Sequence, residues 1–178
     1  MIFHPTELDG VFVVERQAHS DPRGSFARVF DREPFAERGL MTAIEQSSVS
    51  SNARAGTLRG LHLQRAPHAE AKLVRCTRGA IFDVAVDLRE GSPSFGRWTA
   101  AELTPDNGRM LYVPEGCAHG FQTLEDDSDV VYDISVRYAP EAVIGVRWDD
   151  PHLAVAWPIV PPLVISERDA ALPQLTAL

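Results

Sequence analysis

Short runs of strand-forming residues, separated by turn signals, recur along almost the whole chain and constrain its fold more than any other feature. In residues 80–89, Phe82, Val84 and Val86 alternate with smaller or acidic residues, which is the period-two pattern of a β-strand. Only residues 33–40 and 167–172 show helical character. Many short strands at nearly regular spacing predict a sandwich or a barrel, with the jelly roll among the candidates. The predicted strands cover residues 10–16, 56–64, 72–79, 80–89, 96–103, 109–114, 119–124, 129–138 and 144–148.

The length of 178 residues suits a single domain. We expect this domain to cover residues 1–178, with an N-terminal strand or arm and a C-terminal arm from about residue 158. The Pro-rich residues 158–162 favour an arm that runs across the surface of the barrel.

Composition excludes several classes of partner. Lys and Arg number 17 and Asp and Glu number 25, for a formal net charge of −8. This balance argues against nucleic acid or an anionic membrane as the main partner, because phosphate binding favours a basic face. A small anionic ligand stays open, since a few arginines can gather in a pocket. Two cysteines make no disulfide framework, and the chain shows neither a signal peptide nor an apolar run of ~18 residues. We therefore expect a cytoplasmic protein.

Two glycine–histidine spacings point to chemistry. Five residues separate a glycine from His62, and the pattern G-x5-P-x-G-x2-H covers residues 108–119, ending at His119. These resemble the two halves of the cupin signature, in which strands of a small barrel aim histidines into the lumen. Metal-binding cupins carry a second histidine where Gln64 stands and a glutamate near Lys72. An ammonium there repels a divalent cation but can stabilise an oxyanion, so we expect no metal. The alternative is a pair of ordinary half-buried histidines.

Longer segments resemble the dTDP-4-dehydrorhamnose 3,5-epimerase family over nearly the whole chain. The most specific are LRGLHLQ at residues 58–64 and KLVRCTRGAIFDVAVDLREGSPSFGRW at residues 72–98. The others are DPRGSF, VPEGCAHGF, WDDP and SERDAALPQL. The resemblance implies an all-β, cupin-type jelly-roll barrel with few short helices. It also implies a cofactor-independent epimerase, usually a homodimer, that acts on a nucleotide-diphospho-sugar, most simply a dTDP-4-keto-6-deoxyhexose.

The resemblance assigns four catalytic positions. A 4-keto group acidifies the C–H bonds at C3 and C5, so the reaction needs a base, a group that holds the enolate and an acid on the opposite face. His62 matches the base and Asp169 the carboxylate that orients it. Lys72 would meet the C4 oxygen, and Tyr132 matches the proton donor. Asp83 is a second candidate for the partner of His62; its other interpretation is an outward-facing polar residue on a strand.

The resemblance also assigns substrate contacts. Arg23 and Arg59 match contacts to the diphosphate and sugar, since a guanidinium fork suits phosphate oxygens. Tyr138 would share a strand face with Tyr132 and stack on the base. The remaining expected contacts are Phe26, Gln46, Ser48, His119 and Arg168.

Three departures from the family pattern affect this substrate side. Arg28 replaces a usual acidic residue, Ser48 a usual Asn, and Val143 a usual Glu. The identity of the base, and whether C3, C5 or both are inverted, therefore stay open. Other functions also stay open: a metal-dependent cupin such as a dioxygenase, a non-catalytic sugar-binding cupin, and a 3,4-ketoisomerase that moves the carbonyl.

Overall fold

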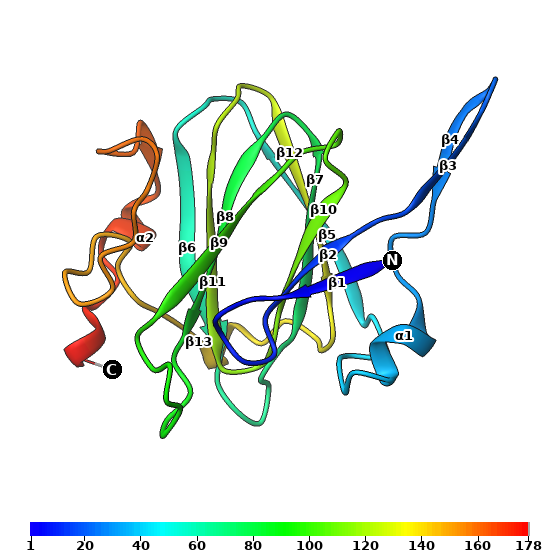
Figure 1. Cartoon of the computed structure of the whole chain (residues 1–178). Coiled ribbons are helices and arrows are strands. Elements are labelled where there is room, and N and C mark those ends of the chain that lie inside the picture. Colours follow the sequence, from blue (N-terminus) through cyan, green and yellow to red (C-terminus); the bar gives the residue numbers. More distant parts are fainter. Residues whose placement is uncertain (178) are drawn as a thin grey trace.

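Two antiparallel β-sheets face each other and enclose the core of the molecule (Figure 1). The computed structural model describes residues 1–177. The first sheet has the order β1 (Ile2–Pro5), β2 (Phe12–Glu15), β10 (Arg109–Val113), β7 (Lys72–Arg78), β12 (Ser128–Ile134) and β5 (Gln46–Asn52). The second has the order β13 (Val143–Gly145), β6 (Thr57–Gln64), β11 (Cys117–Thr123), β8 (Ile81–Asp87) and β9 (Trp98–Leu103). The predicted all-β jelly-roll class is confirmed.

Apolar side chains from both sheets meet between the layers. Val74 and Leu111 of the first sheet pack with Ile81 and Phe121 of the second, and all four are buried. The strand β8 is buried on both faces, because its outer face packs against the segment around Trp157. The acidic residues Asp83 and Asp87 alternate with these outer side chains, so they lie on the inner face, where both are fully buried.

The C-terminal segment covers the outer face of the second sheet (Figure 1). Its short strand β14 (Val164–Ile165) runs parallel to β6. The side chain of Gln122 binds the segment twice, accepting from the backbone N–H of Ile159 and donating to its carbonyl. The last residue of the predicted arm, Leu178, lies outside the described residues.

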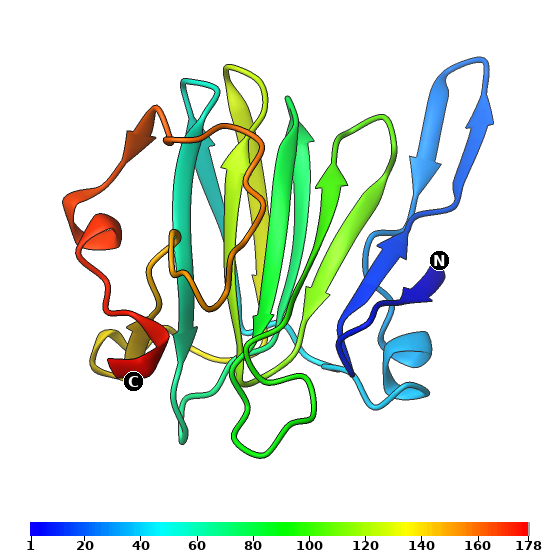
Figure 2. The same ribbon diagram turned by 60° about the vertical axis from the view of Figure 1, so that its left-hand side comes forward.

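A two-stranded ribbon projects from the opposite side of the molecule. The strands β3 (Ala18–Asp21) and β4 (Gly24–Ala27) form this hairpin, which leads away from both sheets (Figures 1 and 2). The side chain of Phe26 is 73% exposed on it. The hairpin was not predicted, because its strands are short and carry almost no apolar pattern.

The helices are few and short, as expected. The α-helices are α1 (Arg32–Ala36) and α2 (Glu167–Ala170), with 3-10 turns at Pro140–Ala142 and Leu175–Ala177. Both α-helices end earlier than predicted, and Gly39, with φ of +69°, lies beyond the shortened end of α1. Ser166 caps α2 by accepting a hydrogen bond from the N–H of Asp169. Within the described part of the chain, no helix has the length and apolarity needed to cross a membrane.

Candidate active site

A pocket of about 420 Å³ opens into the space between the sheets. It is lined by residues of β5, β6, β7, β11, β12 and β13 together with α2 and the segments beside them. The structure brings together nine of the predicted site residues there. They are His62, Lys72, Tyr132 and Asp169 of the catalytic set, and Ser48, Arg59, His119, Tyr138 and Arg168 of the binding set.

An irregularity in β6 lets Arg59 and His62 share this pocket. Residues three apart on a regular strand face opposite sides. Here β6 shifts register against β11, so that His62 pairs with His119 while Arg59 pairs with Phe121. The extra residue is a β-bulge, and it brings both side chains into the same pocket.

Glycine makes this bulge possible. Gly60 has φ of +117°, a conformation that residues with a Cβ rarely adopt. A Cβ built on Gly60 would lie only 2.6 Å from the Cα of Gly120 on β11. The close approach of the two backbones therefore requires glycine at position 60.

The predicted base is paired with the predicted carboxylate. His62 Nε2 lies 2.9 Å from Asp169 Oδ1, and the side chains are 30% and 8% exposed. Burial raises the pKa of Asp169, but hydrogen bonds from His62 and from the N–H of Gly60 outweigh it and hold the pKa below its usual value. When Nε2 carries a proton and donates a hydrogen bond to Asp169, the other ring nitrogen, Nδ1, is left to accept a proton.

A second histidine–aspartate pair lies on the neighbouring strands. His119 Nε2 is 2.8 Å from Asp83 Oδ1, and both residues are buried. Both interpretations of Asp83 were therefore wrong, since it neither orients His62 nor faces outward. Its other oxygen, Oδ2, is buried without a hydrogen-bond partner among residues 1–177. Burial raises the pKa of Asp83, and the positive charges of His119 and Lys72 oppose the shift.

Lys72 is a pocket residue and not a solvated surface lysine. Its ammonium lies 2.7 Å from a carboxylate oxygen of Glu70, and the two side chains are 11% and 8% exposed. Glu70 also lines the pocket and was not predicted. A signal for the lysine was present in the composition, because Lys72 is the only lysine in the chain.

Tyr132 reaches the pocket from the first sheet. Its ring meets that of His119 edge to face, with centroids 5.7 Å apart. Burial and the nearby Asp83 raise the pKa of Tyr132 far above that of a free phenol, although the charge of Arg59 lowers it. A phenol is protonated at neutral pH, as a proton donor must be, and the shift does not change this.

Tyr138 lies beyond the strand on which it was expected. The strand β12 ends at Ile134, so the predicted shared strand face with Tyr132 is wrong. Tyr138 still lines the pocket and is 52% exposed. Its backbone N–H donates to Gln46 Oε1 at 2.6 Å, and Gln46 supports the pocket's edge without lining it.

A sequence model described as dTDP-4-dehydrorhamnose 3,5-epimerase matches residues 5–177. The chain belongs to this family. It is 43% identical to the dTDP-4-dehydrorhamnose 3,5-epimerase of Sinorhizobium fredii over 178 residues, which is all of this chain and 91% of that protein. The crystal structure of the Elizabethkingia anophelis enzyme of the same name is similar with a TM-score of 0.95, at 37% identity over 99% of this chain and 97% of the other.

A further similar structure is that of ChmJ, a 3'-monoepimerase from Streptomyces bikiniensis in complex with dTDP-quinovose. Its TM-score is 0.90 at 36% identity, over 97% of this chain and 87% of that one. The comparisons confirm the predicted family and the predicted enzyme class, an isomerase that epimerises.

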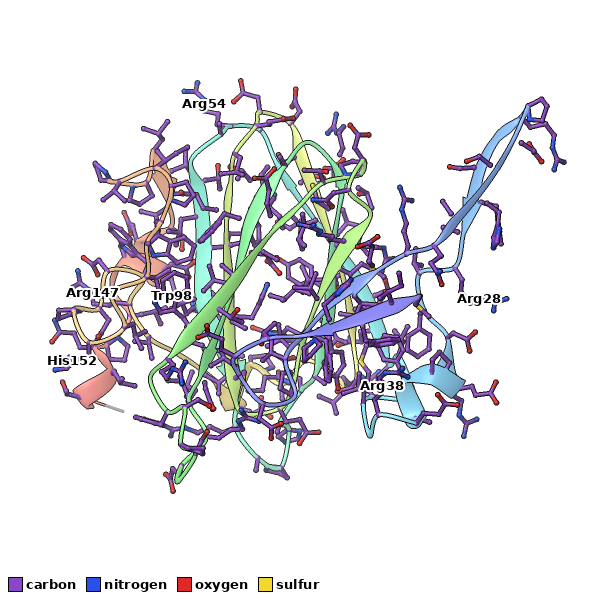
Figure 3. All side chains as sticks on the ribbon, viewed as in Figure 1. Arg28, Arg38, Arg54, Trp98, Arg147 and His152 are labelled. Carbon is purple, nitrogen blue, oxygen red and sulfur yellow. The ribbon has the colours of Figure 1, made fainter. Side chains whose placement is uncertain are left out.

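The three departures from the epimerase family pattern fall in two places. Ser48 and Val143 line the pocket, so they change its surface directly. Arg28 does not line the pocket; it lies near the base of the hairpin in Figure 3 and forms an ion pair with Asp31. Its effect on the pocket of the same chain is therefore indirect.

Besides Gln46, two predicted contacts of the epimerase family do not line the pocket of their own chain, and these two lie away from it. Arg23 and Phe26 lie on the hairpin, where Arg23 is paired with Asp21. Both side chains are largely exposed to solvent. Among residues 1–177, no fold of the chain onto itself brings Arg23 or Phe26 to His62.

The donor set for a metal is also not assembled in the part of the chain that the structure describes. There, no three His, Cys, Asp or Glu side chains are placed to hold an ion. The two pocket histidines are each engaged by an aspartate, and Lys72 lines the pocket where metal-binding cupins carry a glutamate. The metal-free reaction stays a prediction, as does the role of each site residue.

Proposed function

We propose that the pocket binds a dTDP-linked 4-keto-6-deoxyhexose and inverts one or both carbons beside the keto group. The observation that carries this proposal is the meeting of a His–Asp pair, a lysine and a protonated tyrosine in one cavity. An epimerisation at an acidic C–H bond needs these three functions and no redox step.

His62 removes the proton. Its Nδ1 takes a proton from the carbon next to the C4 carbonyl. The electron pair of the broken C–H bond forms the C=C bond of the enolate, and the π pair of the carbonyl moves to the C4 oxygen. Asp169, a carboxylate with a lowered pKa, stabilises the imidazolium that forms.

Lys72 stabilises the enolate. Its ammonium is a compact positive charge in a pocket wall with little solvent, so its attraction to the forming oxyanion is only weakly screened. Groups of this kind lower the barrier because they meet a charge that exists only near the transition state.

Tyr132 returns a proton to the carbon from the opposite face. Its hydroxyl O–H bond breaks, the C–H bond forms with inverted configuration, and the enolate electrons return to the carbonyl. Solvent then reprotonates the phenolate and takes the proton from His62, so the enzyme is restored.

The polar residues around this centre suit the rest of the substrate. Arg59 and Arg168 supply positive charge for the diphosphate, and the exposed ring of Tyr138 offers a surface on which the base can stack. His119 and Ser48 lie where they can hydrogen-bond the sugar. ChmJ, a similar protein, was crystallised with dTDP-quinovose, which supports dTDP as the nucleotide.

We also propose that the enzyme is a homodimer in which each hairpin completes the pocket of the other copy. The support is the hairpin itself, which projects from the molecule with Phe26 73% exposed and Arg23 at its tip (Figure 2). An aromatic and an arginine suit a base and a phosphate. The free, buried Cys76 and Cys117 agree with action in the reducing cytoplasm.

The experiment is incubation with dTDP-4-keto-6-deoxyglucose in deuterated water, followed by NMR at C3 and C5. We expect deuterium at one or both carbons together with inverted product, and slower turnover of the UDP- and GDP-linked sugars. A carbonyl that moves to C3 would instead identify a ketoisomerase. Binding without exchange would identify a sugar-binding protein.

A further inference from the structure

Glu70 is a buried carboxylate of the pocket to which the proposed reaction gives no task. Its Oε1 lies 2.7 Å from Lys72 Nζ, and its side chain is only 8% exposed. Burying two charges costs free energy even when they pair, so such a pair is a poor choice for stability alone. The pair is placed in the wall of the pocket, where both members line the cavity.

The identity of the cation strengthens this point. Lys72 is the only lysine in the chain; the other residues in the total of 17 Lys and Arg are all arginines. For a simple ion pair with a carboxylate, arginine is the better partner because its planar fork binds both oxygens. Lysine instead offers a compact charge with three N–H donors on a flexible stem.

This geometry defines what Glu70 can do. The ammonium is ion-paired with Glu70 on one side, and its three N–H donors can also serve other acceptors. Without a fixed partner, a four-carbon stem would let the ammonium sample several rotamers. The carboxylate limits that freedom from a position two residues earlier in the chain, just before β7 begins.

We propose that Glu70 is a positioning residue for the epimerisation. It holds the ammonium of Lys72 so that a free N–H meets the C4 oxygen as the enolate forms. The inference rests on the proposed function and adds to it a residue that acts through another. A misplaced catalytic group costs as much as 10²-fold in rate, which sets the scale of the effect.

The kinetic experiment compares Glu70→Ala with Glu70→Gln. The alanine variant should lower kcat for deuterium exchange about 10- to 100-fold with little change in KM, because orientation is lost while binding stays. The amide oxygen of glutamine still accepts from the ammonium, so Glu70→Gln should recover most of kcat. Lys72→Met gives the rate without any ammonium, and Glu141→Ala, at an exposed position, controls for loss of an acidic residue.

A second readout does not depend on turnover. Protein labelled with ¹³C,¹⁵N-lysine gives signals from one side chain only, because the chain has one lysine. When the ammonium is held in one orientation, its two Cε protons have different chemical shifts. We expect two shifts in the wild type and in Glu70→Gln, and one averaged shift in Glu70→Ala.

Each outcome decides the inference. An alanine variant that keeps both normal kcat and two separate shifts would show that Glu70 positions nothing. A glutamine variant as slow as the alanine variant would assign the effect to charge and overturn positioning. If the wild type incorporates no deuterium into any 4-keto nucleotide sugar, the proposed function fails. The NMR comparison then still tests whether Glu70 fixes the orientation of the Lys72 ammonium. Should Glu70→Ala not fold, Glu70→Met replaces it, because it keeps the bulk without an acceptor.

Discussion

His62 and His119 are cross-strand partners on the adjacent strands β6 and β11, and the Nε2 atom of each imidazole is hydrogen-bonded to a different aspartate. The two pairs differ in environment. His62 is 30% exposed and its partner has a lowered pKa, whereas His119 is 4% exposed and its partner has a raised one. When two carboxyl groups of one site have pKa values shifted in opposite directions by their environments, they take different roles. The open pair with the ionised carboxylate suits a base, and the sealed pair suits a fixed part of the wall.

This difference in environment predicts different kinetic effects when each histidine is replaced. Replacing His62 by Asn should lower deuterium exchange by about 10²- to 10⁴-fold, the usual contribution of a general base. Replacing His119 by Asn should act mainly on KM. Kinetics of both variants with the same dTDP-sugar test this, and a His62 variant within about tenfold of normal turnover, roughly 1.4 kcal/mol in barrier, would exclude His62 as the base.

Tyr132→Phe should separate exchange from inversion. His62 can still remove the proton and return a deuteron to the same face, while Lys72 holds the enolate. We expect deuterium in the substrate at a measurable rate and inverted product reduced by about 10²- to 10⁴-fold. NMR of exchange and stereochemistry in one tube provides the measurement. Normal inversion would assign the acid to water or to another group.

Gly60→Ala should be far more destabilising than Gly91→Ala. Both glycines have positive φ, but a Cβ at Gly91 has no neighbour within 4 Å, whereas one at Gly60 meets the backbone of β11. We expect a cost of about 1–2 kcal/mol at Gly91 and more than about 4 kcal/mol at Gly60. Urea unfolding measures both free energies. Equal costs would mean that β11 can move aside.

Asp87 should make stability fall in acid. Burial raises its pKa, but hydrogen bonds from Arg89, Ser92 and Ser94 outweigh this and lower it. A lowered folded-state pKa gives stability that is present above the unfolded pKa of about 3.9 and is lost as pH falls through the folded value.

The variant Asp87→Asn should therefore lose about 3 kcal/mol at pH 7, since Arg89 is left without its partner. This loss should shrink below about pH 4, where Asp87 of the unfolded wild-type chain begins to protonate while the folded carboxylate stays ionised. Asp149→Asn is the control, because its pair with Arg147 is exposed and should contribute less than about 1 kcal/mol. Urea midpoints across pH test both, and a pH-independent difference would contradict the assignment.

A mixed dimer should recover activity that two variants lack. One copy carries His62→Asn and the other Arg23→Ala with Phe26→Ala, and tandem tags isolate the pair. If hairpins are exchanged, one of the two sites combines an intact His62 with an intact hairpin, so we expect about half of normal activity. If the mixed dimer is inactive and the His62 variant is inactive alone, the hairpin does not complete the pocket of the other copy.

The sequence predicted the strands that carry a strong apolar pattern and missed those that do not. The strands β6 to β12 are rich in apolar or alternating residues, and each overlaps a predicted run. The strand β5 contains a single apolar residue, Val49, which is 65% exposed, so periodicity had nothing to detect. The hairpin escaped for the same reason.

The sequence could not show which histidine pairs with which aspartate inside the pocket. Spacing indicated the two histidines, and the family resemblance supplied Asp169 with Asp83 as a second candidate, but the choice of partners depends on tertiary structure. His62 meets an aspartate 107 residues away because α2 folds back onto β6, while Asp83 is held by the register of β8 and β11. The contact between Glu70 and Lys72 likewise depends on how the segment before β7 turns toward the lumen.

The solitary lysine also makes the pocket chemically addressable. Reagents that acylate amines have two primary amines to attack, the exposed N-terminus and the ammonium of Lys72. A bound sugar nucleotide would shield the second and leave the first open. The ratio of the two acylated products, read by mass spectrometry, would therefore count the vacant sites in any preparation of this protein.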